Sequence, residues 1–264
     1  MLVKDILNCI TEVAPLHWQE SYDNAGLQVG DLNAEAHKAL ICLDITEEVV
    51  DEAIAKNCNV IVSHHPLIFR GLKHLTPETY VERAVMKVIK HDIAMISMHT
   101  NLDNSYLGVS RVLAEKLGLK NLHFLQPSAD EPEACGVGMI GAFEAPMEEL
   151  DFLQFVACTI GSPCLRHSAL TGRKIQKVAL CGGSGSPFMG DALKNHADAY
   201  LTADIKYHDF FVPEGNILLV DGGHFETEQF TKELICELIR KKFPTFAAEI
   251  AETLTNAVCY FVRN

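Results

Sequence analysis

The sequence alternates short apolar runs with amphipathic stretches, and this alternation occurs twice along the chain. The short runs are rich in Val, Ile, Leu and Ala, which is typical of buried strands. In the longer stretches the apolar residues recur at intervals of three and four, which is the period of a helix. Strands that alternate with helices form mainly parallel sheets with helices on both faces. The order therefore predicts an α/β fold of two similar lobes that arose by internal duplication and face each other across a cleft.

The stretch 126–133 is rich in Pro, Glu and Asp and marks the best boundary, so we expect a first α/β lobe at 1–125 and a second at 126–264. C-terminal elements can pack back onto the first lobe. The first copy predicts helices at 3–13, after Thr46, at 80–90 and at 105–117, and strands at 27–29, 39–43, 59–63 and 93–98. The second copy predicts helices at 148–160, from 191 and around 230–239, and strands at 164–170, 177–181, 199–202 and 216–220. Two further strands are expected at 137–143 and 254–262.

Composition excludes several classes of protein. A chain of 264 residues with 48% hydrophobic and 22% charged residues can bury a full core without disulfides or metals. No stretch reaches the roughly 18 consecutive apolar residues of a membrane span, and the N-terminus lacks the order of a signal peptide. The formal charge of −13 disfavours nucleic-acid binding. The nine cysteines form no C-x-x-C pair, most lie in apolar runs, and they are expected to be reduced core thiols of a cytoplasmic protein.

Polar clusters follow four of the apolar strands, which is the usual position of a ligand site in such sheets. His64 and His65 follow the strand at 59–63, and Pro66 holds His65 in the extended region. Adjacent side chains on an extended segment point in opposite directions, so these two histidines would supply one ligand to each of two ions. A surface pair of histidines with no ligand is the alternative.

Two further pairs combine an imidazole with a carboxylate. His99 and Asp103 follow the strand at 93–98, where a turn with an Asx cap is the alternative. His224 and Glu228 stand four residues apart at the start of a helix, which places both on one face. A first-turn Glu that is favoured by the helix dipole is the alternative there.

Taken together, the set contains His64, His65, Asp103, His224 and Glu228, and no thiolate. Such a set can hold two metal ions about 3.5–4 Å apart with one carboxylate bridging them. Nitrogen and oxygen ligands suit Zn²⁺, Mn²⁺, Fe or Co²⁺, and the sequence does not choose among these ions.

Two other features are weaker candidates for a role in chemistry. The segment Gly182 to Gly185 could cradle an anion with its backbone amides or could simply form a tight turn. Asp204 and His208 form another pair at a spacing of four. With His99, they are candidates for hydrogen-bonding the ligating histidines or for proton transfer, with ordinary polar caps as the alternative.

Several motifs in a fixed order resemble the family of GTP cyclohydrolase 1 type 2 homologues, also called the NIF-three-like family. The motifs that carry the resemblance are residues 22–27 (YDNAGL), 63–69 (SHHPLIF), 99–103 (HTNLD), 202–208 (TADIKYH) and 221–228 (DGGHFETE). The chain departs from the family pattern in having Tyr22 where Trp is common and Ala203 where Gly is common. Its length is that of the short bacterial type, without the inserted middle domain.

The resemblance implies a dinuclear metal centre in the cleft and a ring-shaped homohexamer. His64, Asp103 and Glu228 would hold one ion, and His65, His224 and Glu228 the other, with Glu228 bridging. It also implies a metal-dependent hydrolase that acts on a nucleotide-like or other phosphorylated small molecule, of which GTP ring opening is one case. The alternative is a non-catalytic metal carrier, metallochaperone or ring-shaped assembly factor. Five ligands for two ions leave open coordination positions, which favours an enzyme.

Overall fold

The computed structural model of the chain describes residues 1–261 and divides into two units. Unit 1 contains Met1–Leu102 and Thr231–Ala257, and unit 2 contains Asp103–Phe230 and the C-terminal residues from Val258. Each unit holds one sheet, and helices pack on both faces, so the fold is mixed α/β. The lobe boundary expected at residue 126 was drawn from composition and stays a prediction.

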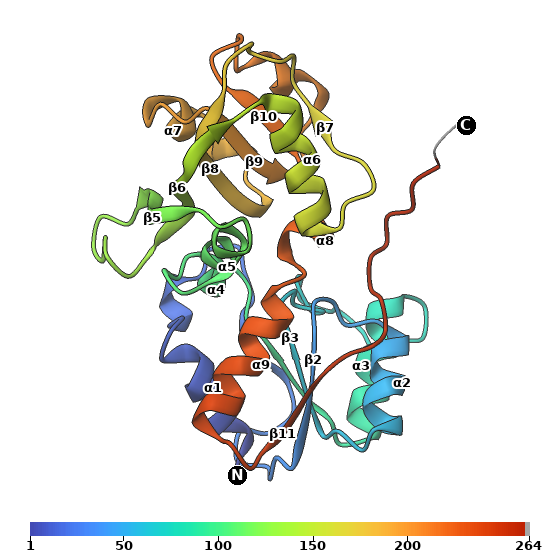
Figure 1. Cartoon of the computed structure of the whole chain (residues 1–264). Coiled ribbons are helices and arrows are strands. Elements are labelled where there is room, and N and C mark those ends of the chain that lie inside the picture. Colours follow the sequence, from blue (N-terminus) through green and yellow to red (C-terminus); the bar gives the residue numbers. More distant parts are fainter. Residues whose placement is uncertain (262–264) are drawn as a thin grey trace. The chain divides into compact units, whose positions relative to one another are not determined.

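Unit 1 is built on a five-stranded sheet in the order β1-β4-β3-β2-β11 (Figure 1). Its strands are β1 (Gly26–Val29), β2 (Lys38–Cys42), β3 (Val60–Ser63), β4 (Ala94–Ser97) and β11 (Ala247–Ile250). The pairings among β4, β3, β2 and β11 are parallel, and β1 joins the edge antiparallel to β4. The carboxyl ends of β2, β3 and β4 therefore lie at one edge of the sheet.

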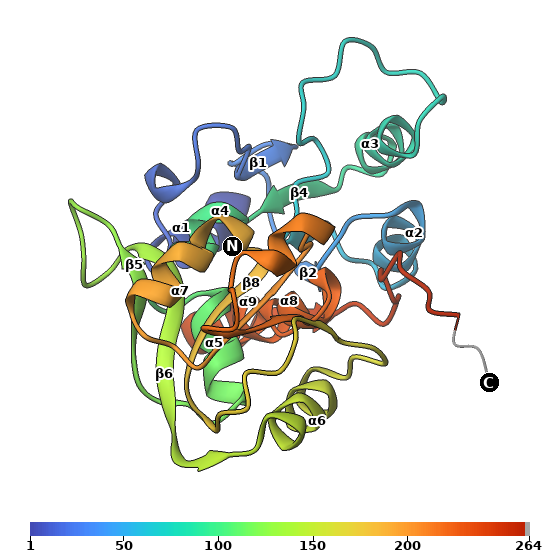
Figure 2. The ribbon, with the colours of Figure 1, turned by 90° about the horizontal axis from the view of Figure 1, so that it is seen from above.

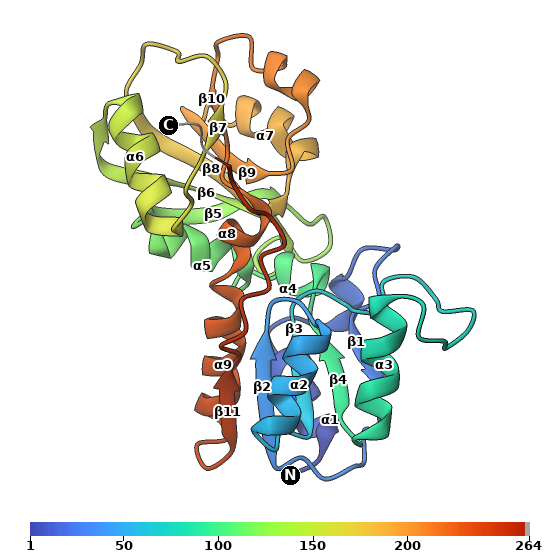
Figure 3. The ribbon, with the colours of Figure 1, turned by 90° about the vertical axis from the view of Figure 1, so that its right-hand side faces the viewer.

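Helices cover both faces of this sheet. Figures 1 and 3 show α2 (Glu47–Ala55) and α3 (Tyr80–Lys90) on one face, with α1 (Val3–Thr11) and α9 (Thr231–Lys242) on the other. Because neighbouring strand residues face opposite ways, Leu40 and Cys42 of β2 pack with Val49 and Val50 of α2. Thr46 caps α2 by accepting a hydrogen bond from the Val49 amide at 3.3 Å, as the sequence predicts. Short helices are η1 (Leu16–Trp18) and α4 (Thr100–Asp103), and the division between the units falls within α4.

Unit 2 is built on a six-stranded sheet in the order β5-β6-β8-β9-β10-β7. Its strands are β5 (Lys120–Pro127), β6 (Gly136–Met147), β7 (Arg166–His167), β8 (Ile175–Ser184), β9 (Ala199–Ala203) and β10 (Leu218–Asp221). Only β8, β9 and β10 pair in parallel, whereas β5, β6 and β7 are antiparallel to their neighbours. The expectation of a mainly parallel sheet is therefore wrong for the outer strands of this unit.

Two apolar clusters fill the faces of the second sheet. One joins the strands to α5 (Val109–Lys116) and α6 (Glu149–Ile160), and the other joins them to α7 (Met189–Lys194). The remaining short elements are η2 (Ser186–Phe188), η3 (Tyr207–Phe211) and α8 (His224–Glu228). Like β2 to β4 in unit 1, the strands β8 to β10 bring their carboxyl ends to one edge, where Asp204 and α8 follow.

Most expected elements are present within a few residues of the expected bounds, and the helix at 80–90 has the expected bounds. Three expectations are wrong. The helix expected from 105 begins at Val109, because Ser105 pairs with Cys135 in an isolated β-bridge and Gly108, in an extended conformation, is the N-cap. The strand expected at 164–170 is paired only at Arg166–His167. Residues 254–261 form no strand, and the last strand is β11 instead; position 262 lies outside the described residues.

Two further findings concern composition. In the part of the chain that the structure describes, no helix is long and apolar enough to cross a membrane. The expectation of core thiols holds for some cysteines only. The buried ones are Cys9, Cys42, Cys58, Cys181 and Cys236, and the exposed ones are Cys158, Cys164 and Cys259.

Candidate metal centre

Three histidines lie together at the carboxyl edge of the sheet in unit 1. His64 and His65 directly follow Ser63 at the end of β3, and His99 follows Ser97 at the end of β4 by two residues. One ligand atom from each ring lies within 4.8 Å of the others, so the three form a group that can bind a metal. The ring centroids of His64 and His65 are 4.8 Å apart. The alternation expected for these two side chains is therefore wrong, because β3 ends at Ser63.

Each ring in this cluster is held through Nδ1. The acceptors are Met98 O for His64 at 2.8 Å, Asp44 Oδ1 for His65 at 2.7 Å, and Asp23 Oδ1 for His99 at 2.8 Å. A neutral imidazole that donates from Nδ1 carries its lone pair on Nε2, which is the state a metal needs. The cluster thus has both the ligand type and the outer hydrogen bonds of histidine metal sites.

The two carboxylates behind these rings are held in the charged form. Burial alone would raise the pKa of Asp23, but hydrogen bonds from His99 and Thr100 hold it well below its usual range. Burial also opposes ionisation of Asp44, yet His65 and Thr255 lower its pKa. A charged acceptor makes Nδ1 the donor and increases the basicity of Nε2. Both rings are therefore oriented for coordination.

Unit 2 contributes an imidazole and a carboxylate on one helical turn. In α8, His224 Nε2 lies 3.0 Å from Glu228 Oε2, as the spacing of four predicts. Asp204, directly after β9, accepts a hydrogen bond from His224 Nδ1 at 2.7 Å. Burial would lower the pKa of His224, but Asp204 and Glu228 raise it to about 11. The pair is therefore a protonated imidazole between two carboxylates, and a cation can replace the shared proton.

The charges of Asp103 and Glu228 both affect the pKa of Cys181, a buried thiol in unit 2. Burial is the largest cause that raises the pKa of Cys181 to about 12, and the charges of Asp103 and Glu228 add to it. Cys181 thus stays protonated at neutral pH, and a protonated thiol is a poor metal ligand. The donor set of unit 2 is accordingly oxygen and nitrogen, which suits a divalent ion such as Zn²⁺, Mn²⁺ or Fe²⁺.

Gly182 and Gly183 at the end of β8, and Gly185 directly after it, use their amides within the fold rather than for an anion. The amides of Gly182, Gly183 and Gly185 already donate to hydroxyl groups. Their acceptors are Ser110 Oγ at 3.3 Å, Thr227 Oγ1 at 3.0 Å and Thr202 Oγ1 at 2.8 Å, respectively. Gly183 has a φ of +60°, and a Cβ there would lie 2.0 Å from Glu228 Oε1. Glycine at this position therefore leaves room for the carboxylate.

The remaining candidates, His99, Asp204 and His208, differ in their contacts. His99 and Asp204 hydrogen-bond as described above, whereas His208 lies exposed in η3 with its ring against Tyr207 and Phe211. The side chain of His208 forms no hydrogen bond or ion pair with another residue within 1–261. Sequence reasoning assigned no role to two residues that hold rings, Asp23 and Asp44. The signal for Asp44 is its position directly after the apolar run 39–43, and Asp23 lies in the motif 22–27.

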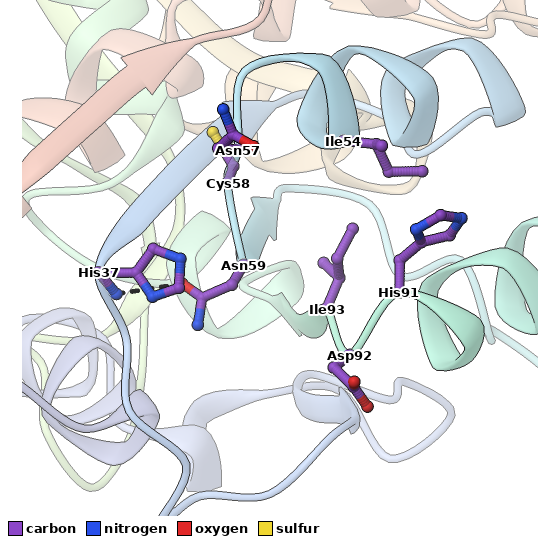
Figure 4. A pocket seen from close by; sticks show the side chains of 8 residues that line it. All are labelled: His37, Ile54, Asn57, Cys58, Asn59, His91, Asp92 and Ile93. Carbon is purple, nitrogen blue, oxygen red and sulfur yellow. Dashed lines mark hydrogen bonds between the residues drawn. The ribbon is translucent and has the colours of Figure 1, made fainter.

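A separate cavity of about 350 Å³ lies at the opposite edge of the sheet in unit 1 (Figure 4). His37, Asn59 and Ile93 line it, and these residues precede or begin β2, β3 and β4. Asn59 accepts a hydrogen bond from the His37 amide at 3.1 Å and donates one to Glu35 O at 2.7 Å. The amide side chain is thus committed to the fold, and the cavity is less suited to chemistry than the histidine cluster.

Comparisons with known proteins agree on one family for this chain. The sequence profile of Duf34/NIF3 (NGG1p interacting factor 3) matches residues 1–257. A protein of Clostridium perfringens named GTP cyclohydrolase 1 type 2 homolog is 36% identical over 231 residues, which cover 86% of this chain and 87% of that protein. A protein of Clostridium acetobutylicum with the same name is 34% identical over 229 residues, covering 86% and 85%. A hypothetical protein of Staphylococcus aureus of known crystal structure has a TM-score of 0.93 at 30% identity and covers 99% of both chains. The chain belongs to the Duf34/NIF3 family.

Proposed function

We propose that the chain is a metal-dependent hydrolase with a dinuclear centre. The observation that carries this proposal is the way in which the histidines are held. His64, His65 and His224 each have Nδ1 within 2.8 Å of an acceptor oxygen, so Nε2 is the atom that would bind a metal, in His224 after loss of the proton that it shares with Glu228. Structural packing alone does not require carboxylates behind the rings of two of them.

The assignment of ligands follows the family resemblance. His64 and Asp103 hold one ion, His65 and His224 hold the other, and Glu228 bridges the two. Under this proposal the histidine cluster of unit 1 and the pair of unit 2 face each other across a cleft. The internal duplication belongs to the same proposal, because β2 to β4 and β8 to β10 are both parallel and both carry polar residues after their carboxyl ends.

When bound, two divalent ions lower the pKa of water and stabilise negative charge on the substrate. The residues of the chain orient the ligands and transfer protons. Asp44 and Asp204 keep the rings of His65 and His224 oriented. His99, which Asp23 holds through Nδ1, has its Nε2 available to accept or return a proton during hydrolysis. The histidines, Asp103 and Glu228 leave coordination positions open for substrate.

The substrate class is a nucleotide-like or other phosphorylated small molecule. Two observations support it: relatives at 36% and 34% identity are named GTP cyclohydrolase 1 type 2 homolog, and an oxygen-and-nitrogen metal site suits phosphate chemistry. Opening of the purine ring of GTP is the first reaction to test. A fold and a site do not fix a substrate, so the screen should extend to other nucleotides and to phosphoesters.

The test is metal analysis of protein purified without chelator, followed by a turnover screen with each of Zn²⁺, Mn²⁺, Fe²⁺ and Co²⁺. We expect turnover that His64→Ala and Asp103→Ala abolish and that His208→Ala retains. Full metal loading with no turnover on any compound would favour the carrier or metallochaperone alternative. Turnover that survives in the His64 and Asp103 variants would place the reaction elsewhere.

Assembly and location are part of the proposal. We infer a homohexameric ring, because small two-lobed subunits of this family form closed assemblies that use up complementary surfaces. We also infer a cytoplasmic protein, since the nine cysteines form no C-x-x-C pair and most lie in apolar runs. Light scattering at micromolar concentration tests the assembly: a mass near that of one chain of 29.2 kDa would contradict it.

A further inference from the structure

Two exposed aromatic rings continue outward from the histidine cluster of unit 1. Phe69 lies with its ring centroid 6.1 Å from that of His99, and Tyr22 lies 6.3 Å from Phe69. Tyr22 is 64% exposed and Phe69 is 41% exposed. Large exposed apolar side chains that stand together mark binding surfaces more often than isolated ones do. The rings of Tyr22 and Phe69 meet at 63°, so a flat group can stack on one ring while it meets the edge of the other.

The fold fixes the position of Phe69. Ile68, its neighbour, is bonded to the segment around β1 through both backbone groups. Its amide donates to Gln28 Oε1 at 2.9 Å, and its carbonyl accepts from Asn24 Nδ2 at 2.6 Å. Figure 2 shows the segment between β3 and α3 leaving the sheet beside β1 as a long loop. Phe69 therefore stands on an anchored part of this loop, beside the segment that precedes β1 and carries Tyr22.

The next residues of the loop carry positive charge. Arg70 and Lys73 are exposed, and neither forms an ion pair or hydrogen bond with another residue in the range 1–261. The loop is tied down again at His74, whose Nδ1 lies 2.7 Å from Glu82 Oε1 in α3. Two unneutralised cations in a chain with a net charge of −13 attract an anionic ligand to this loop.

We propose that Tyr22 and Phe69 form a subsite for the flat heteroaromatic ring of the substrate, and that Arg70 and Lys73 attract its phosphate groups. The proposal rests on the proposed function, because it places this subsite beside His99 of the metal centre. A ring alone would need only the aromatic pair, and a phosphate alone only the cations. Because the aromatic pair and the cations are neighbours, the subsite favours a molecule that carries both a flat ring and phosphate groups, as a nucleotide-like compound does.

Calorimetry with three probes separates the two parts of the subsite: GTP, guanosine, and inorganic tripolyphosphate. Phe69→Leu keeps the apolar volume and removes the ring. Since stacking of a base on an aromatic side chain is worth roughly 1–3 kcal/mol, we expect about 5- to 150-fold weaker binding of GTP and guanosine, with tripolyphosphate unchanged. Phe69→Trp should retain GTP binding. The double variant Arg70→Gln with Lys73→Gln should weaken GTP and tripolyphosphate and leave guanosine unchanged.

Phe155→Leu is the matched control, because Phe155 is 38% exposed and its ring meets that of Phe143 at 5.9 Å, far along the chain from the loop. It should bind all three probes as the wild type does. Equal binding of GTP by Phe69→Leu and wild type, or no binding of GTP by wild type, would overturn the subsite. So would a lower solution mass of Phe69→Leu with GTP binding intact, because the rings would then be a contact between copies of the chain.

The same samples distinguish failure of the subsite from failure of the proposed function. Turnover of GTP that is identical in Phe69→Leu and wild type would leave the hydrolase standing and remove the subsite. GTP binding that depends on Phe69, in a metal-loaded protein without turnover, would keep the subsite and remove the hydrolase. Metal content should be the same in Phe69→Leu and wild type, because Phe69 supplies no ligand.

Discussion

Thr255 donates a hydrogen bond from Oγ1 to Asp44 Oδ2 at 2.8 Å, and the other oxygen of Asp44 accepts from His65 Nδ1 at 2.7 Å. The C-terminal segment after β11 thus reaches the carboxylate that orients a candidate metal ligand. Glu52 of α2 holds this segment in place by accepting hydrogen bonds from Thr253 N at 2.9 Å and Thr253 Oγ1 at 2.6 Å. Thr255 is accordingly a positioning residue for His65.

The first prediction follows from this chain of hydrogen bonds. Loss of an outer hydrogen-bond partner of a metal ligand costs roughly 10–100-fold in metal affinity, so Asp44→Asn should weaken one ion by that amount. Thr255→Val removes a support one step further away, and we expect a smaller loss at the same ion. Competition with a chelator of known affinity measures both. Thr253→Val is the control, because its hydroxyl binds Glu52 and not Asp44.

We expect the metal affinity to be lowest in Asp44→Asn, intermediate in Thr255→Val, and highest in Thr253→Val and the wild type. Equal losses in Thr255→Val and Thr253→Val would show that anchoring of the tail matters and the contact with Asp44 does not.

The second prediction concerns stoichiometry. Protein isolated without chelator should contain close to two divalent ions per chain if the centre is dinuclear. Glu228→Ala should lose both ions, because it removes the proposed bridge, whereas His65→Ala should affect one ion more than the other. Plasma emission spectrometry on desalted protein gives the ratio. Retention of one ion at full affinity in Glu228→Ala would contradict the bridging role.

Much of the site was predictable because its signals are local. His64 and His65 follow an apolar run, and the spacing of His224 and Glu228 places them on one helical turn whatever the rest of the fold does. Strands β2 to β4 and β8 to β10 could equally be predicted from the sequence, since each is a short apolar run followed by polar residues. Buried parallel strands are the elements that composition marks most strongly.

Other features depend on contacts between residues far apart in sequence. The pairing of Asp23 with His99 joins positions 76 residues apart, and no spacing rule connects them. β5 was missed because its side chains alternate irregularly between exposed and buried positions. The strand expected at 254–262 failed for the opposite reason. Its apolar residues fit a strand, but residues 251–257 extend along α2 and form hydrogen bonds with Glu52 and Asp44.

The third prediction tests why residue 183 is glycine. Gly183→Ala places a methyl group where Glu228 Oε1 stands and keeps a left-handed φ of +60°. We expect metal affinity to fall sharply, because the carboxylate must move. The backbone strain alone costs about 1–2 kcal/mol of unfolding free energy.

Gly172→Ala is the matched control for that strain. Gly172 has a φ of +73°, and a Cβ there meets nothing within 4 Å. Denaturant titration should show at least as large a loss of stability in Gly183→Ala as in Gly172→Ala, and chelator competition should show a loss of metal only in Gly183→Ala. A normal metal content in Gly183→Ala would mean that Glu228 can coordinate from another position.

The last prediction is the pH dependence of metal binding. Without metal, Asp204 and Glu228 raise the pKa of His224 to about 11, so its ring carries a proton at neutral pH. A metal that binds Nε2 must displace that proton, which makes binding tighter as pH rises. For one released proton the affinity increases about tenfold per pH unit between pH 7 and 9.

Calorimetric titration in buffers of different ionisation enthalpy counts the released protons directly. Wild type should release close to one proton at pH 8 for the ion that binds His224. Asp204→Asn removes one of the two carboxylates that hold the proton, so its pKa for His224 falls and fewer protons are released. Lys194→Gln serves as the control, because Lys194 pairs with Asp191 at 3.1 Å on α7 and not with α8. An affinity that does not change between pH 7 and 9 would show that His224 is not a ligand, because the proton between Asp204 and Glu228 would then stay in place as the metal binds.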